Sequence, residues 1–150
     1  MNEIFIALIG LLSGLIGAFI GARTANQKNY SQTVSMHRLD WMDNLYDDIG
    51  VMLGAIEVLR NANTEEEKNK YNYKYNKARA LVLSKLNRKE DKHQIMFMLI
   101  VKLDNFKDSY SDKEYFAVKE SILESMSQVG KEVWETVKQE TKLVGGKTSV

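Results

Sequence analysis

The sequence predicts an all-α protein with one N-terminal transmembrane helix, followed by a small cytoplasmic bundle of about four helices. Residues 4–22 form an uncharged apolar run, proline is absent from all 150 residues, and apolar side chains downstream recur at helical spacing. Without proline, little interrupts long helices. We therefore divide the chain into a transmembrane anchor (residues 1–23), a juxtamembrane linker (24–33), a helical bundle (34–143) and a flexible tail (144–150).

The predicted anchor is the 19-residue run from Ile4 to Ala22, which carries no charge and only one weakly polar side chain, Ser13. At about 1.5 Å per residue it spans roughly 28 Å, close to the hydrocarbon thickness of a bilayer. The basic residues Arg23 and Lys28 follow the run, and one acidic residue precedes it. The positive-inside rule then predicts a single-pass protein of the cell membrane, with its N-terminus outside and its C-terminal domain cytoplasmic. A cleaved signal peptide is the alternative, although the basic start of such peptides is missing.

Small residues line one side of the predicted anchor. Gly10, Gly14, Gly17 and Gly21 are spaced four, three and four residues apart, and Ser13 lies beside them. At about 100° per residue, the four glycines fall within an arc of roughly 60°. Such a glycine zipper lets another membrane helix approach closely. We expect this face to pack, within the lipid bilayer, against a second copy of the chain or a host membrane protein.

Downstream, local patterns predict each helix of the bundle. One apolar seam repeats with spacings of three and four, typical of a helix, and consists of Met42, Leu45, Ile49, Met52, Ile56 and Leu59. Thr64 with Glu67, and Ser111 with Glu114, have the spacing of capping boxes that open two further helices. We expect residues 24–33 either to link the anchor to the bundle or to continue its helix.

The apolar run 95–101 predicts a buried helix that continues through Leu103 and Phe106, with a short strand as the alternative. The last helix is expected to end before Gly145. Its predicted buried residues are Phe116, Ile122, Leu123, Met126, Val133 and Val137.

No residues of the sequence group into a recognisable active site. Cysteine is absent, and the two histidines, His37 and His93, are 56 residues apart, which argues against a metal site. A net charge of +1 argues against a polyanion binder, and Glu90 and Asp91 interrupt the basic stretch 85–93. We therefore expect a non-enzymatic protein without cofactor, metal, small-molecule substrate or nucleic-acid partner.

Arg38 and Trp41 are three residues apart, which places them on one face of a helix. The guanidinium can stack on the indole or reach a buried carboxylate from there. Trp134 on the last helix is a candidate for the matching element. These three residues are either structural anchors or a contact surface.

With these residues in place, the sequence resembles a group of small bacterial and phage membrane proteins that carry an Arg-x-x-Trp block after the membrane helix. The resemblance rests on segments 38–45, 85–93 and 131–138. In size and layout the chain is similar to the prophage superinfection-exclusion proteins of lactic acid bacteria. That likeness implies a host–virus interaction at the cell membrane that blocks entry of a second phage's DNA. The alternatives are a membrane-tethered adaptor that recruits a cytoplasmic partner, such as a phage-defence effector, and a holin-like pore-former.

Overall fold

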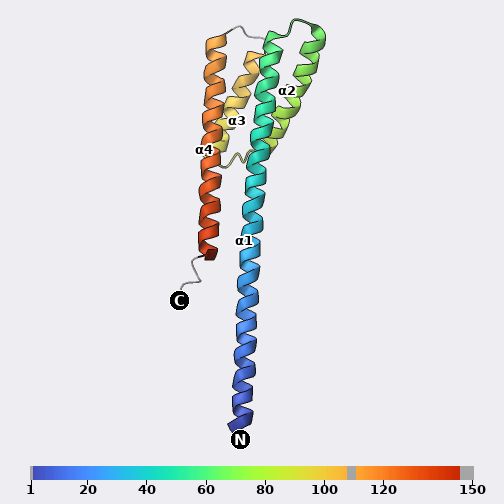
Figure 1. The fold of residues 1–150 in the computed structure, drawn as a ribbon. Coiled ribbons are helices and arrows are strands. Elements are labelled where there is room, and N and C mark those ends of the chain that lie inside the picture. The colour runs from blue at the N-terminus through green and yellow to red at the C-terminus, as the bar shows by residue number, and fades with distance from the viewer. Residues whose placement is uncertain (1, 108–110, 146–150) are drawn as a thin grey trace. The chain divides into compact units, whose positions relative to one another are not determined.

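Four α-helices and one short 3-10 helix make up the described part of the chain (Figure 1). The computed structural model describes the backbone of residues 2–107 and 111–145, and the side chains of residues 17–26, 29–107 and 111–142. The elements are α1 (Asn2–Asn61), α2 (Glu65–Lys85), α3 (Asp91–Leu103), η1 (Asp104–Phe106) and α4 (Asp112–Gly145). Within those residues no strand occurs, so the all-α prediction is confirmed.

The start of α2 follows the predicted capping box. The hydroxyl of Thr64 accepts a hydrogen bond from the backbone N–H of Glu67 over 3.2 Å. Three glutamates in the first turn, residues 65–67, favour this end of the helix because its dipole is positive there.

The run 95–101 is helical, as predicted, and belongs to α3. The helix tightens into η1 at its end, where the N–H of Lys107 donates to the carbonyl of Asp104. Helix α4 begins after Ser111, whose carbonyl accepts from the N–H of Tyr115 over 3.1 Å.

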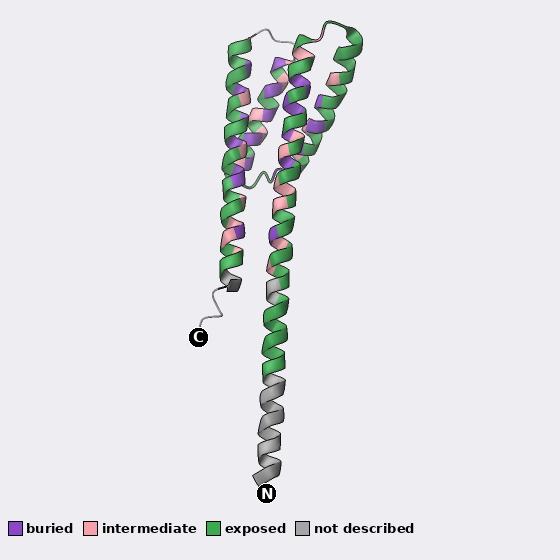
Figure 2. Cartoon of the chain, in the orientation of Figure 1, coloured by how far each residue is buried: buried purple, intermediate pink, exposed green. Residues whose placement is uncertain are grey.

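The chain forms two compact units, one of residues 39–135 and the other of residues 1–38 with 136–150. In the first of these, apolar side chains of α1, α2, α3 and α4 form one core (Figure 2). Four residues of the predicted α1 seam are fully buried there, namely Leu45, Ile49, Met52 and Ile56. The seam prediction is therefore confirmed in its central part.

The predicted buried face of α4 is wrong for two residues. Phe116 is 51% exposed and Leu123 is 41% exposed, whereas Ile122 is buried. The physical reason is that α4 carries apolar side chains on two faces. Packing selects the face that contains Tyr115, Val118, Ile122 and Val129, while Phe116 and Leu123, seven residues apart, share the other.

The other compact unit joins the N-terminal part of α1 to the C-terminal end of α4. Residues 24–33, for which the sequence left a linker or a continued helix open, are helical. Among residues with described side chains, no helix is long and apolar enough to cross a membrane. Most of the predicted anchor, residues 4–16, lies outside those side chains, and so does the predicted tail.

Candidate functional site

Arg38 on α1 reaches a carboxylate on α4. Its guanidinium lies 3.1 Å from Oε1 of Glu140, and the buried hydroxyl of Ser35 donates to Oε2 of Glu140 over 3.0 Å. The hydroxyl of Ser31 donates to the backbone carbonyl of Glu140 over 3.3 Å. Three residues of α1 thus hold one residue of α4. The carboxylate partner expected for Arg38 exists, although it is partly exposed rather than buried.

Trp41 stacks on a histidine. The ring centroids of Trp41 and His93 are 5.6 Å apart with an interplanar angle of 26°. His93 is buried, and its Nδ1 accepts a hydrogen bond from the backbone N–H of Asn87 over 3.0 Å. This contact connects α1 to the start of α3 and to the α2–α3 connection. No local pattern in the sequence pairs His93 with Trp41.

Trp134 lies on α4 with 49% of its surface exposed. Its indole therefore offers contact area to solvent or to a partner, whereas Trp41 is partly buried against the core. The two tryptophans differ in environment, so one role does not describe both.

The glycine face is described only in part. A Cβ added at Gly17 or Gly21 meets nothing within 4 Å, so this side of α1 is open there. Gly10, Ser13 and Gly14 lie outside the described side chains. The same stretch of α1 exposes large apolar groups, with Phe19 70% and Ile20 58% accessible.

The basic stretch 85–93 is occupied by contacts within the chain. Lys85 lies 2.6 Å from Asp48, Arg88 lies 4.0 Å above the ring of Phe97, and Lys92 lies 2.7 Å from Glu132. Charges that are already paired attract phosphate less strongly. This geometry favours a structural role for the stretch.

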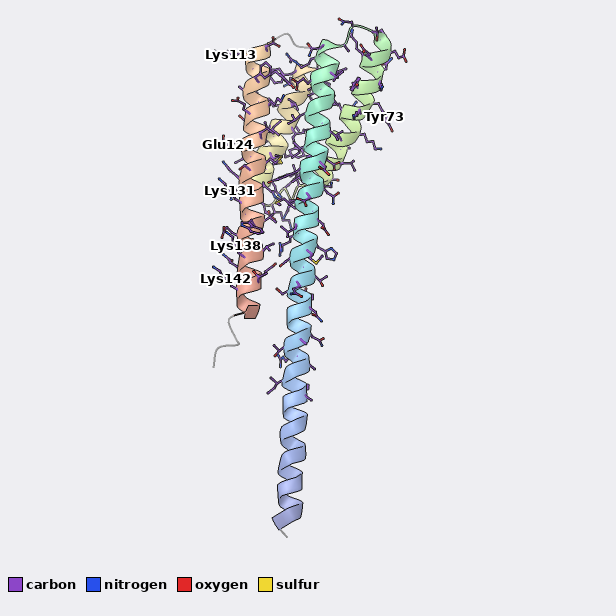
Figure 3. All side chains as sticks on the ribbon, in the orientation of Figure 1. Tyr73, Lys113, Glu124, Lys131, Lys138 and Lys142 are labelled. Carbon is purple, nitrogen blue, oxygen red and sulfur yellow. The ribbon has the colours of Figure 1, made fainter. Side chains whose placement is uncertain are left out.

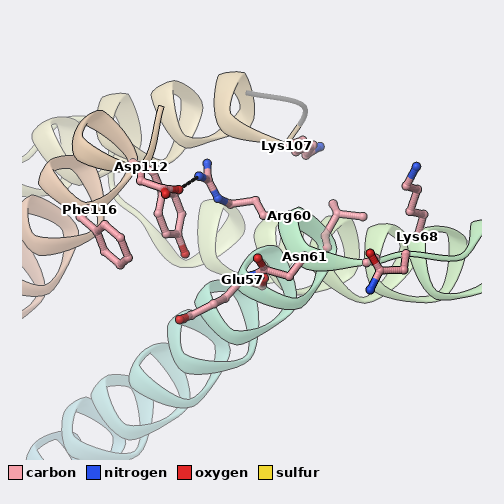
Figure 4. A pocket seen from close by; sticks show the side chains of 11 residues that line it. Glu57, Arg60, Asn61, Lys68, Lys107, Asp112 and Phe116 are labelled. Carbon is pink, nitrogen blue, oxygen red and sulfur yellow. Dashed lines mark hydrogen bonds and ion pairs between the residues drawn. The ribbon is translucent and has the colours of Figure 1, made fainter. Parts of the chain in front are cut away.

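A polar pocket of about 680 Å³ lies between the end of α1 and the start of α4 (Figure 4). Arg60 donates to the carboxylate of Asp112 over 2.7 Å and to the carbonyl of Phe106 over 3.1 Å. Its guanidinium also lies 4.1 Å from the ring centroid of Tyr115. The guanidinium of Arg60, the principal cation of the pocket, is thus bound by other groups of the same chain.

The other charged groups beside this pocket are paired as well. Lys119 Nζ lies 2.7 Å from Glu57, and this hydrogen bond raises the pKa of Lys119. Burial raises the pKa of the Tyr115 phenol, so Tyr115 stays protonated and is a poor base. Nowhere in the described residues do three or more histidine or acidic side chains group as metal ligands.

A second polar network, which is partly buried, joins α2 to η1. The hydroxyl of Tyr75 donates to Oδ1 of Asp104 over 2.8 Å, and Arg79 lies 2.7 Å from Oδ2 of the same carboxylate. The Lys107 ammonium lies 4.5 Å from the Tyr75 ring centroid. Burial, followed by the bond to Asp104, raises the pKa of Tyr75 far above its ordinary value. These contacts attach α2 to η1 and are structural.

Comparison with known proteins returns no relative. The chain matches no protein-family model, and neither a curated protein nor a solved structure is significantly similar to it.

Proposed function

We propose that this chain is a non-enzymatic, membrane-anchored prophage protein that blocks the entry of incoming phage DNA at the cell membrane. The observation that carries the proposal is the uncharged run 4–22 on α1, whose described end leaves Phe19 and Ile20 more than half exposed. Exposed apolar surface of this kind gains about 25 cal/mol per Å² when lipid replaces water around it. A lipid bilayer is the environment that suits this segment.

The open glycine face gives the anchor a way to act on a neighbour. Gly17 and Gly21 leave room beside the α1 backbone, and Gly10 and Gly14 continue the same face in the sequence. Membrane helices associate by close backbone packing at such faces. On this proposal the anchor packs against itself or against a host membrane protein through which phage DNA passes, and the bundle lies on the cytoplasmic side.

The resemblance to superinfection-exclusion proteins supports this role. Both named residues of the Arg-x-x-Trp block, on which the resemblance rests, make specific contacts in the fold. Arg38 fastens the end of α4 through Glu140, and Trp41 packs on His93. The charged groups of the polar pocket are engaged with one another, which fits a protein that acts by contact rather than by catalysis.

The test is to express the full chain in a phage-sensitive host and to measure phage adsorption and intracellular phage DNA separately. Normal adsorption with lost DNA entry is the expected result. A variant with Ile9→Arg and Leu12→Arg makes membrane insertion roughly 6–8 kcal/mol less favourable, so it should abolish exclusion. The matched control, Ile9→Leu with Leu12→Ile, should retain it. Unchanged DNA entry with the wild-type chain, or full exclusion by the arginine variant, contradicts the proposal.

One observation favours the adaptor as a second candidate. The outer face of α3 is apolar yet exposed, with Ile95 at 48%, Met98 at 55% and Val101 at 42%. Purification of the chain from solubilised membranes separates the two candidates, because exclusion predicts a membrane-embedded partner and an adaptor predicts a soluble partner. The variant Met98→Glu should lose binding of that soluble partner. Collapse of the membrane potential on expression would instead indicate a holin-like pore-former.

A further inference from the structure

Charge is distributed unevenly between the two compact units. Residues 23–38 and 136–150, which belong to one unit, contain six lysines and arginines and a single acid, Glu140, for a net charge of +5. Residues 39–135 contain 15 basic and 18 acidic residues, a net charge of −3. We call five of these basic residues the basic collar: Arg23, Lys28, Arg38, Lys138 and Lys142.

Glu140, the one acid of these two segments, has its carboxylate bound by Arg38 and Ser35. Lys138 and Lys142 lie two residues before and after Glu140, so they point to the opposite side of α4 at about 200° from it. Figure 3 shows both lysines on the side of α4 that faces away from α1. The pair between Arg38 and Glu140 thus brings lysines of the C-terminal helix beside the N-terminal one and leaves Lys142 exposed.

Helical geometry places these charges close to the predicted membrane surface. Arg23 follows directly on the apolar run, and Lys28 lies five residues further, about 8 Å along the helix axis. Because Glu140 contacts Ser31, Lys142 lies near the level of Ser31, about 12 Å from Arg23 along the axis. The head-group layer is about 5–7 Å thick and the Debye length is about 8 Å, so the backbone of all three residues lies within reach of the surface field.

We propose that the basic collar binds anionic phospholipid in the leaflet next to it and thereby holds the C-terminal end of α4 at the membrane surface. This inference rests on the proposed membrane anchor. Each lysine or arginine near an anionic surface contributes about 1 kcal/mol, a roughly fivefold increase in association. Residues 39–135, with a net charge of −3, carry no comparable excess of basic residues.

The experiment uses the full chain in vesicles and separates anchor from collar. Flotation with neutral phosphatidylcholine vesicles reports the anchor. Electron paramagnetic resonance with spin-labelled lipids then compares phosphatidylglycerol with phosphatidylcholine at the protein boundary. We expect phosphatidylglycerol to associate at least about threefold more strongly at low salt, and the preference to vanish near 1 M salt, where the Debye length is about 3 Å.

Two triple variants with the same change in charge locate the effect. Arg23→Gln with Lys28→Gln and Lys142→Gln should remove the preference for phosphatidylglycerol. The control, Lys74→Gln with Lys77→Gln and Lys113→Gln, changes exposed lysines of the other unit and should keep it.

Equal association of the two lipids with the wild-type chain, or an equal loss of the preference in both triple variants, contradicts lipid binding by the collar. The proposed membrane anchor is still supported if the chain floats with neutral vesicles. Flotation only with vesicles that contain phosphatidylglycerol overturns the anchor and keeps the collar. Binding of a short DNA duplex in place of anionic lipid assigns the charges to nucleic acid and overturns the inference.

Discussion

The carboxylate of Glu140 lies 3.1 Å from the guanidinium of Arg38, across a sequence separation of 102 residues. Both side chains are partly exposed, so the ion pair alone stabilises the protein by at most about 1 kcal/mol. Its importance is local, because Ser31 and Ser35 bind the same residue. These contacts fasten the last turns of α4 along α1.

Replacing Glu140 by alanine should therefore release the end of α4 and leave the core intact. We expect amide hydrogen exchange in residues 136–142 to accelerate by about five- to tenfold, which corresponds to roughly 1–1.4 kcal/mol of local stability. The buried amides of α1 around Ile49 should exchange as before. Gln139→Ala, an exposed neighbour, is the control. A uniform acceleration over the whole chain would show that the contact is part of the global core.

Local patterns in the sequence were sufficient to predict the central α1 seam and the start of α2, although α3 ends at Leu103 and not beyond Phe106. The α1 seam and the Thr64 cap depend on residues three or four positions apart, and the structure contains both. Partners distant in sequence were not predictable in this way. Periodicity places Arg38 and Trp41 on a helix face, but it does not say which helix comes to lie against that face.

The α4 helix illustrates the same limit. Tyr115 and Phe116 are adjacent aromatic residues, and each belongs to an apolar stripe with helical spacing. Only the neighbouring helices decide between the stripes, and they bury Tyr115 while Phe116 remains half exposed. A single sequence read for periodicity cannot distinguish two such faces.

His93 should contribute to stability in two separable ways, as an acceptor for the N–H of Asn87 and as a ring stacked on Trp41. His93→Ala removes both and leaves a cavity where the buried ring was, so we expect a loss of about 2–4 kcal/mol. In His93→Asn the amide oxygen can replace Nδ1 as acceptor, and the loss should be about 1 kcal/mol smaller. Urea unfolding of both variants measures the difference. Equal losses would mean that the hydrogen bond to Asn87 contributes nothing.

Tyr75 should make the protein sensitive to alkaline pH. Burial raises the pKa of its phenol in the folded chain, whereas the unfolded phenol titrates near its ordinary value of about 10. Below about pH 10 both states are protonated and the stability is fully present. Above it only the unfolded chain loses this proton, so stability falls by up to about 1.4 kcal/mol per pH unit.

The variant Tyr75→Phe isolates this effect, because the remaining tyrosines titrate in both proteins. Near neutral pH it should be about 1 kcal/mol less stable, since the hydrogen bond to Asp104 is lost. Above about pH 10 its stability should decline less steeply than that of the wild type. Urea unfolding at a series of pH values tests this, and parallel curves would refute the assignment to Tyr75.

Two helical glycines should respond in opposite directions to replacement by alanine. A Cβ at Gly54 on α1 meets nothing within 4 Å, whereas a Cβ at Gly130 on α4 collides with the hydroxyl of Tyr46. Alanine is favoured over glycine in a helix by about 1 kcal/mol, so Gly54→Ala should stabilise the protein by roughly 0.5–1 kcal/mol. Gly130→Ala should destabilise it by about 1–3 kcal/mol despite the same helical gain.

The collision predicts that removing the Tyr46 hydroxyl rescues Gly130→Ala. That hydroxyl donates to the carbonyl of Met126 over 3.1 Å, so the phenol cannot move aside without breaking a bond. In a Tyr46→Phe background the oxygen is gone, and a small shift of the ring accommodates the added methyl group. A double-mutant cycle by urea unfolding should give a favourable coupling of at least about 1 kcal/mol between the two substitutions. Additive losses would mean that α4 moves away from α1 to relieve the contact, and that Gly130 is not required by Tyr46.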